Sequence, residues 1–428
     1  MKRQLILCLG ALFVLLSCAK NKAVIANALD YEELLNQHPK VPQWVQQDLE
    51  FWANKTLEHP EQFPYKAKLA VAYGAIFAIT QDILDLNYSN LLWEDVNQVT
   101  GNREAGYLRS AAKQAITAHE FKKAYALLTT AETHGGQLKS TRKMLFDVCM
   151  ELGLYQKAQQ YLNFITDLKD VDYLIRRSKW EDYQGNLTAA ISNLEQVMEY
   201  AYTNKNKALQ QWSLTNLGDY YGHQGNIAKA YTSYLRALGL DPANKYAKKG
   251  IAYIAFAHDK NPTEALRIME AITVVNRTPD DLLFMAELYD FAGDNSAKNK
   301  CLTAFKLLLK DKEFGELYNI PLALVLAQED ANYTAALELL NHEVTRRATP
   351  ETYGALAYVY MLSGAKYKAL TIAKEHVIGK SEEPVLLLYT AAILKANGLA
   401  NDIPAIKKEL LEAKFELGPL ATQEVLSL

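Results

Sequence analysis

The chain has 428 residues, of which 50% are hydrophobic and 22% charged, with a formal net charge of −3 at pH 7. A single compact core rarely grows this large, so several domains or a repeat array are expected. The slightly acidic balance gives no electrostatic basis for binding nucleic acid, and it argues against a polybasic membrane patch.

The amino terminus has the layout of a secretory signal. Lys2 and Arg3 precede an apolar run from Leu5 to Leu16, and the small residue Ser17 stands directly before Cys18. This run is shorter than the roughly 20 residues that a membrane-spanning helix needs, so a signal peptide over residues 1–17 is favoured over a transmembrane anchor.

The segment Leu15-Leu16-Ser17-Cys18 resembles the lipobox of bacterial lipoproteins. The resemblance implies cleavage before Cys18 and acylation of its thiol and new amino terminus. An ordinary secretory signal that happens to contain a cysteine is the alternative. No aspartate follows Cys18, and the resemblance therefore implies the periplasmic face of the outer membrane. Residues 18–40 are expected to be the lipidated cysteine and a short polar tether.

Residues 41–101 are expected to form an irregular helical unit. Leu69-Ala70 and Tyr73 have the spacing of a first repeat helix. Its partner helix is expected at Ser89–Val99, after a longer connection through Gln81–Asn87.

A repeat pattern is clearest between Gln211 and Asn244. Small residues there allow two antiparallel helices to cross closely, a glycine permits a turn with positive φ, and Asp-Pro stops the second helix. The signature positions are Leu217-Gly218, Tyr221, Gly225, Ala230, Tyr234, Ala237 and Pro242. This segment resembles the tetratricopeptide repeat (TPR), with Leu214 where that family often has tryptophan.

The small crossing residue recurs at intervals of 32 to 40 residues, at Ala124, Ala158, Ala190, Ala230, Ala265, Ala297, Ala336, Ala369 and Ala405. These intervals scatter about the TPR period of roughly 34 residues. Lys298 falls where a strict alignment places the alanine next to Ala297. The pattern predicts an all-α, right-handed α-solenoid of about nine to ten TPR-like helix-turn-helix repeats. The array is expected over residues 102–405 and a C-terminal capping helix over 406–428. An irregular helical enzyme domain is the competing interpretation, which such regular spacing disfavours.

Motifs for catalysis or metal binding are not found. Gly379-Lys380-Ser381 lacks the earlier glycine of a phosphate-binding loop, because Lys374 stands in its place. The histidines are dispersed along the chain. We therefore expect no enzymatic activity, no cofactor and no metal site. Cys149 and Cys301 are expected to be buried free thiols.

The TPR resemblance implies that the first helix of each repeat lines a concave groove that binds protein. Carried over residue by residue, this protein-binding groove holds Arg176, Lys179, Asp182, Trp212, Thr215, Asp219, His223, Tyr246, Lys249, Tyr253, Phe256, Glu287, Asp290, Tyr358 and Met361. Exposed aromatics flanked by charges suit an extended peptide or helix. The alternative is that these side chains only cover the interior of the superhelix.

These features predict an outer-membrane-anchored periplasmic TPR lipoprotein that acts as a scaffold or adaptor. Its partner would be another periplasmic or outer-membrane protein of an assembly, secretion or cell-wall machinery. The alternative function is a glycan-binding lipoprotein of a nutrient-uptake or cell-wall system, with Trp212, Tyr246, Tyr253 and Phe256 as stacking platforms.

Overall fold

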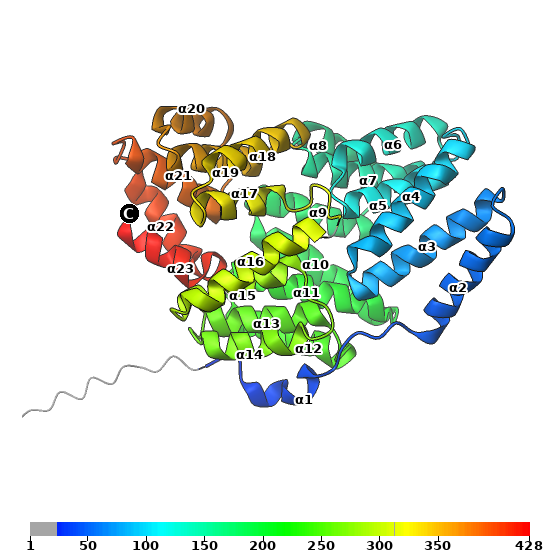
Figure 1. Cartoon of the computed structure of the whole chain (residues 1–428), viewed down its shortest axis with the longest axis horizontal. Coiled ribbons are helices and arrows are strands. Elements are labelled where there is room, and N and C mark those ends of the chain that lie inside the picture. Colours follow the sequence, from blue (N-terminus) through cyan, green and yellow to red (C-terminus); the bar gives the residue numbers. More distant parts are fainter. Residues whose placement is uncertain (1–23, 312) are drawn as a thin grey trace, which may run out of the picture.

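The computed structural model describes residues 24–311 and 313–428, and the regular elements in those ranges are all helices (Figure 1). Cys18 and the expected signal peptide lie outside the described residues. A short 3-10 helix, η1 (Ala28–Asp30), comes first. The helices are α1 (Glu32–Leu35), α2 (Gln43–Glu58), α3 (Phe63–Thr80), α4 (Ile83–Val99), α5 (Ala105–Thr117), α6 (Phe121–His134), α7 (Leu138–Glu151), α8 (Tyr155–Phe164), α9 (Val171–Tyr183), α10 (Leu187–Thr203), α11 (Lys207–His223), α12 (Ile227–Leu240), α13 (Lys245–Ala257), α14 (Pro262–Ile272), α15 (Pro279–Phe291), α16 (Asn295–Asp311), α17 (Asn319–Gln328), α18 (Tyr333–Arg346), α19 (Pro350–Leu362), α20 (Lys366–His376), α21 (Pro384–Ala396), α22 (Ile403–Glu412) and α23 (Lys414–Ser427).

Consecutive helices pack as hairpins, from α3/α4 through to α21/α22. Several odd-numbered helices also touch the next odd-numbered helix, as α7 touches α9, α11 touches α13 and α19 touches α21. The first helices of the hairpins therefore lie on one side of the array, which we call the inner face. The predicted α-solenoid is confirmed. Among the described residues, none of the helices combines the length and apolar character needed to cross a bilayer.

A repeated local device sets the turns inside the hairpins. Gly185 and Gly225 adopt positive φ angles of 75° and 78°, which favour glycine because it has no Cβ. The next residue in each case, Asn186 or Asn226, caps the second helix by accepting a backbone N–H with its side chain. Such a cap contributes about 1 kcal/mol to helix stability. Gly-Asn therefore both turns the chain and starts the next helix.

The crossing alanines are fully buried at Ala124, Ala158, Ala190, Ala230, Ala265, Ala336 and Ala369. The expectation was wrong for Ala297, which is half-buried, and for Ala405, which is exposed. In α16 the crossing position is held by Lys298, whose ammonium group pairs with Asp290 and Glu329 at 2.9 Å each. A buried apolar contact is thus replaced by an ion-paired one in this repeat.

The amino-terminal part is more regular than expected. α3 and α4 form an ordinary hairpin joined only by Gln81 and Asp82, so the predicted longer connection through Gln81–Asn87 was wrong. Gln81 turns the chain with a φ of 57°. The tether expected over residues 18–40 was also wrong from Val24 onward, because Ala26, Tyr31 and Leu35 are buried in the largest hydrophobic core.

The carboxyl terminus is not a single capping helix over 406–428, as had been expected. α22 and α23 are separate helices, and α23 contains a break at Gly418, whose φ and ψ are 73° and 174°. α23 packs on α11, α13 and α21. It therefore lies on the inner face of repeats far away in the sequence.

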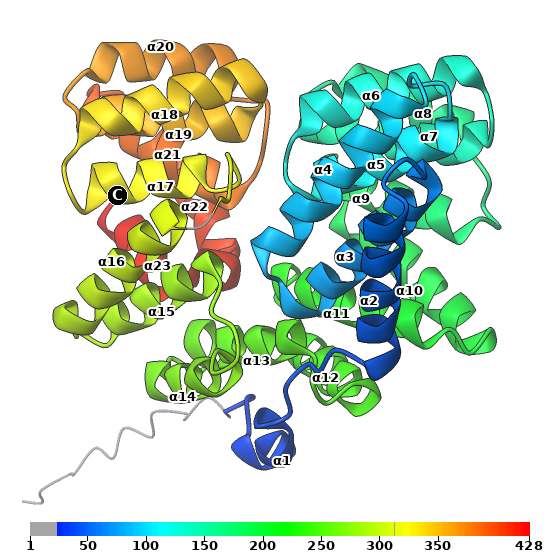
Figure 2. The same ribbon diagram turned by 45° about the vertical axis from the view of Figure 1, so that its right-hand side comes forward.

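The array curves until its two halves meet. Figure 2 shows α12–α14 at the base, with α15–α23 rising on one side and α2–α9 on the other. At the meeting point Lys122 donates to the carbonyl of Thr345 at 2.5 Å, and Arg346 donates to the carbonyl of His119 at 3.0 Å. Arg347 lies 3.6 Å from Glu151. These contacts limit how far the solenoid can open.

Candidate protein-binding face

The centre of the inner face is organised around Tyr234. Its ring packs so closely on α11 and α13 that a Cβ at Gly218 or Gly250 would come within 2.4 Å or 2.5 Å of it. Its hydroxyl donates to one carboxylate oxygen of Asp219 at 2.5 Å, and Tyr246 donates to the other at 2.7 Å. Burial raises the pKa of Asp219, and the two hydroxyl donors oppose that rise. Asp219 thus aligns three consecutive helices.

The part of the inner face formed by α7 and α9 is a ladder of ion pairs. Arg176 donates to Asp147 at 2.6 Å, and Lys179 donates to Glu151 at 2.7 Å. The guanidinium of Arg176 also donates to the carbonyl of Lys143 at 2.9 Å. Because these charges satisfy one another, they hold neighbouring repeats together and leave little unpaired charge for a ligand.

The central stretch of the inner face is covered by the chain's own α23. The hydroxyl of Tyr253 is shared between the carbonyls of Phe415 and Glu416, at 3.0 Å and 2.7 Å. The Phe415 ring stands edge-on to Tyr253, with centroids 5.4 Å apart. It packs so tightly on α11 that a Cβ at Gly222 would lie 2.7 Å from it. This part of the inner face therefore accommodates an aromatic side chain carried on a helix, here Phe415 of α23.

Four carboxylates, Asp182, Glu351, Glu383 and Glu416, lie close enough to influence one another near the start of α23. Desolvation inside the curved array raises the pKa of Glu383, and the charges of Glu351, Glu416 and Asp182 raise it further, whereas His223 lowers it. The pKa values of Asp182 and Glu416 are also raised by desolvation. These residues come from α9, α11, α19, α23 and the start of α21. The interior therefore favours a ligand that brings positive charge.

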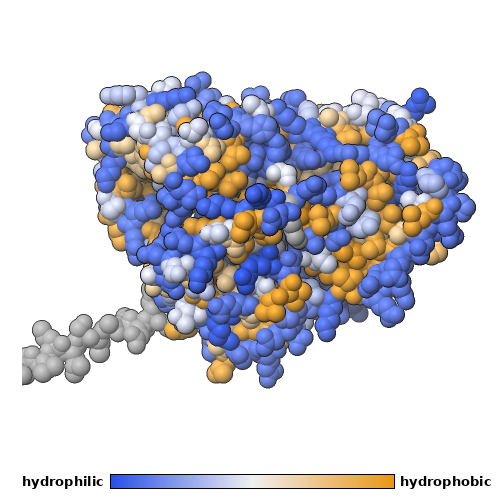
Figure 3. All heavy atoms as spheres, in the orientation of Figure 1, coloured by the Kyte–Doolittle hydropathy of each residue, from blue (hydrophilic) through white to orange (hydrophobic). Residues whose placement is uncertain are grey.

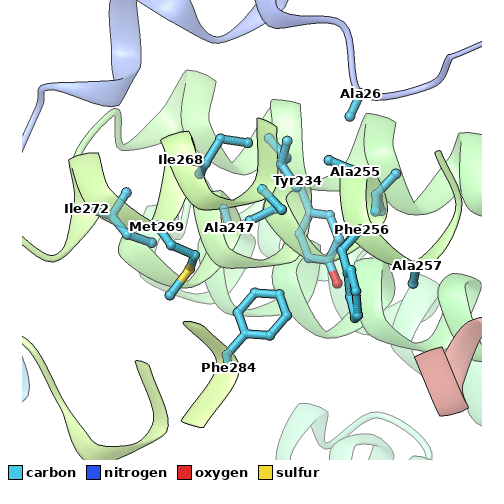
Figure 4. Close-up of a cluster of buried hydrophobic side chains, with 14 of the residues drawn as sticks. Ala26, Tyr234, Ala247, Ala255, Phe256, Ala257, Ile268, Met269, Ile272 and Phe284 are labelled. Carbon is cyan, nitrogen blue, oxygen red and sulfur yellow. The ribbon is translucent and has the colours of Figure 1, made fainter. Parts of the chain in front are cut away.

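The predicted groove residues do not form one exposed surface. Phe256 and Thr215 are buried, so their assignment to a groove was wrong. Figure 4 shows Phe256 pointing into the core beside Phe284. Six of the predicted residues already form hydrogen bonds or ion pairs within the fold. They are Arg176, Lys179, Asp219, Lys249, Tyr253 and Asp290.

The other predicted residues differ in how much of them a ligand can reach. Tyr358 stacks on Tyr389 with centroids 4.2 Å apart, and Met361 packs on a small core cluster. Glu287 is half-buried near Gly418, and burial together with Asp290 raises its pKa to about 7. The exposed members are Asp182, His223, Trp212 at 39% and Tyr246 at 57%.

A second concavity, which was not expected, lies outside the central stretch of the inner face that α23 covers. It has a volume of about 770 Å³ and is lined by α3, α5, the α14–α15 connection and residues 314–318. Figure 3 shows apolar side chains gathered on this side of the molecule, over α3 and α4. No local motif signals the cavity, because its walls come from segments about 200 residues apart.

Residues 213–244 form one helix-turn-helix repeat of this solenoid. Those residues match the tetratricopeptide repeat family. They contain the crossing of Gly218 with Tyr234, the turn at Gly225 and the buried Ala230. This one segment is similar to a tetratricopeptide repeat, and the α-solenoid around it fits a role as a protein-binding scaffold.

Several solved structures are similar to the chain. Human IFIT1 in a dimer with PPP-AAAA is 13% identical, with a TM-score of 0.47 over 78% of this chain and 76% of that one. Yeast Tom70 is 16% identical, with a TM-score of 0.37 over 93% and 87%. A tetratricopeptide repeat protein from Parabacteroides merdae is 19% identical, with a TM-score of 0.33 over 57% and 98%. No curated protein matches the chain.

Proposed function

We propose that this protein is a lipid-anchored adaptor that holds a partner protein at the periplasmic face of the outer membrane, without catalysis. Its lipobox-like segment, ending at Cys18, supports the anchor. Its solenoid fold supports protein binding. The partner would belong to an assembly, secretion or cell-wall machinery.

The observation that carries the binding proposal is the pair of exposed aromatics beside an acidic interior. Trp212 lies two helical turns before Asp219 on α11, and Tyr246 reaches the same Asp219 from α13. Both rings present area to solvent, while Asp182 and Glu383 supply negative charge close to His223, which lies on the same helix as Trp212. We infer that the partner offers a segment with apolar and basic side chains. Large aromatics are the side chains that most often dominate such binding.

The geometry favours this function over glycan binding. Stacking platforms for a sugar must expose a ring face, yet Phe256 is fully buried and α23 covers Tyr253. Only Trp212 and Tyr246 remain from the set that the glycan hypothesis needs.

The binding proposal is tested with Trp212→Ala combined with Tyr246→Ala. Partner proteins are cross-linked in intact cells, captured from detergent-solubilised membranes and quantified by mass spectrometry. Loss of two exposed aromatics is expected to weaken the main partner by about 2 kcal/mol or more, because hot-spot residues contribute at this level. The matched control is Trp44→Ala with Tyr367→Ala, a pair that is 68% and 85% exposed elsewhere on the molecule. Parental yield with the folded double variant would contradict the proposal.

The anchor is tested separately with Cys18→Ser. Removing the thiol is expected to abolish incorporation of a clickable fatty acid and to leave the signal peptide uncleaved. Equal labelling of variant and parent would show that Cys18 is not the acylation site.

A further inference from the structure

The first described residues form an ordered strap on the outer side of the solenoid. Residues 24–37, which we call the N-terminal strap, run beneath α12 and α14 at the lower end of the molecule in Figures 1 and 2. Tyr31 is 1% exposed and Leu35 is 2% exposed. Ala26 points toward Ala255 in the core (Figure 4). The strap is therefore packed into the same core as the central repeats.

Polar contacts hold the strap at both ends. At its start, the backbone N–H groups of Ile25 and Ala26 donate to the buried carboxylate of Asp259 at 3.1 Å and 2.9 Å. At its end, the ammonium group of Lys248 donates to the carbonyls of Leu35 and Gln37 at 3.2 Å and 2.6 Å.

The middle of the strap is fastened by side chains of α12 and α14. Tyr31 donates its hydroxyl to Glu264 at 2.7 Å, and Arg267 pairs with Glu32 at 2.9 Å. Tyr231 donates to Asp30 at 2.9 Å. Since these partners all belong to α12, α14 or the segment next to them, the strap has one defined position on the body.

Only a short segment of chain connects the N-terminal strap to Cys18. Six residue steps separate Cys18 from Val24, and a fully extended chain of that length spans at most about 20 Å. A compact chain of 428 residues has a radius of gyration of about 22 Å. The link is thus shorter than the diameter of the body, so an anchored body cannot turn freely.

We propose that the N-terminal strap fixes the orientation of this protein on a lipid surface, with the outer side of α12 and α14 toward the bilayer. This inference rests on the proposed acylation of Cys18. Val24 and Leu29, which are 66% and 87% exposed on the strap, then meet the interfacial layer of the membrane. The connections near α6 and α20, at the opposite end in both views, face away from it.

The test measures the depth of single labels on the full-length acylated protein in vesicles of outer-membrane phospholipids. Thr263→Cys places a fluorescent label at the start of α14, next to the strap, and Tyr367→Cys places one on α20. Both positions are exposed, whereas the native Cys149 and Cys301 are buried free thiols, as expected from the sequence, and resist labelling. Spin-labelled headgroups are expected to quench the label at position 263 several-fold more than the label at 367.

Release of the strap supplies the second measurement. Tyr31→Ala with Leu35→Ala removes its two large buried side chains, which adds the residues before α2 to the link between Cys18 and the body. The difference in quenching between the two labels is then expected to disappear, while circular dichroism reports unchanged helix content in the body. Equal quenching at both positions in the parental background would overturn the orientation. Failure of the parent to float with vesicles would instead remove the anchor, and the orientation with it.

Discussion

Replacing Gly218 by alanine is expected to strain the contact that joins α11, α12 and α13. The new Cβ would lie 2.4 Å from Cε1 of Tyr234, and 2.7 Å and 2.8 Å from two further atoms of the ring. Tyr234 is 5% exposed, and it also packs tightly against Gly250. Its hydroxyl is held by Asp219 at 2.5 Å. The ring therefore has no free space into which it can retreat.

The size of the effect follows from three contributions. Overpacking of a filled core costs about 1–3 kcal/mol. Displacing the ring weakens the bond to Asp219, which contributes on the order of 1 kcal/mol. Alanine has a better helix propensity than glycine by about 1 kcal/mol, which offsets part of the loss. The net expected loss in free energy of unfolding is about 2 kcal/mol.

Urea denaturation followed by circular dichroism measures this loss. Hydrogen exchange of the amides in α11–α13 locates it, because repeats interact mainly with their neighbours. The matched control is Gly239→Ala near the end of α12, where an added Cβ meets no atom within 4 Å. That variant is expected to be neutral or slightly stabilised. If Gly218→Ala behaved like Gly239→Ala, the packing argument at Tyr234 would be refuted.

Two further predictions concern the segment that covers the inner face. Gly418→Ala forces alanine into a backbone region open essentially only to glycine, at a cost of about 1–3 kcal/mol. Hydrogen exchange in residues 414–428 is therefore expected to become faster, and unchanged exchange would contradict this. The pKa of Glu287 is raised from 4.5 to about 7, so the folded state binds more protons and loses stability as pH rises between these values. Glu287→Gln is therefore expected to raise the urea midpoint over the parent more at pH 8 than at pH 5, and an equal gain at both would refute the assignment.

The sequence by itself determined the repeat class and most helix crossings. A turn such as Gly225-Asn226 and a crossing residue such as Ala230 act within one hairpin, so their physical cause lies within about 34 residues of chain. Where the local rule was broken, as at Lys298, the sequence indicated the position but not the ion pairs that satisfy it.

Only the tertiary structure decided which parts of the inner face are open. Tyr253 bonds to a carbonyl 162 residues away, and Tyr31 bonds to a carboxylate 233 residues away. Such pairings depend on the curvature summed over many repeats, which no single repeat encodes. Helix register placed Phe256 on the first helix of its repeat. Contacts with Phe284 and Phe291 from the next repeat buried it, because tight curvature brings these rings within 6.0 Å and 5.4 Å of its own.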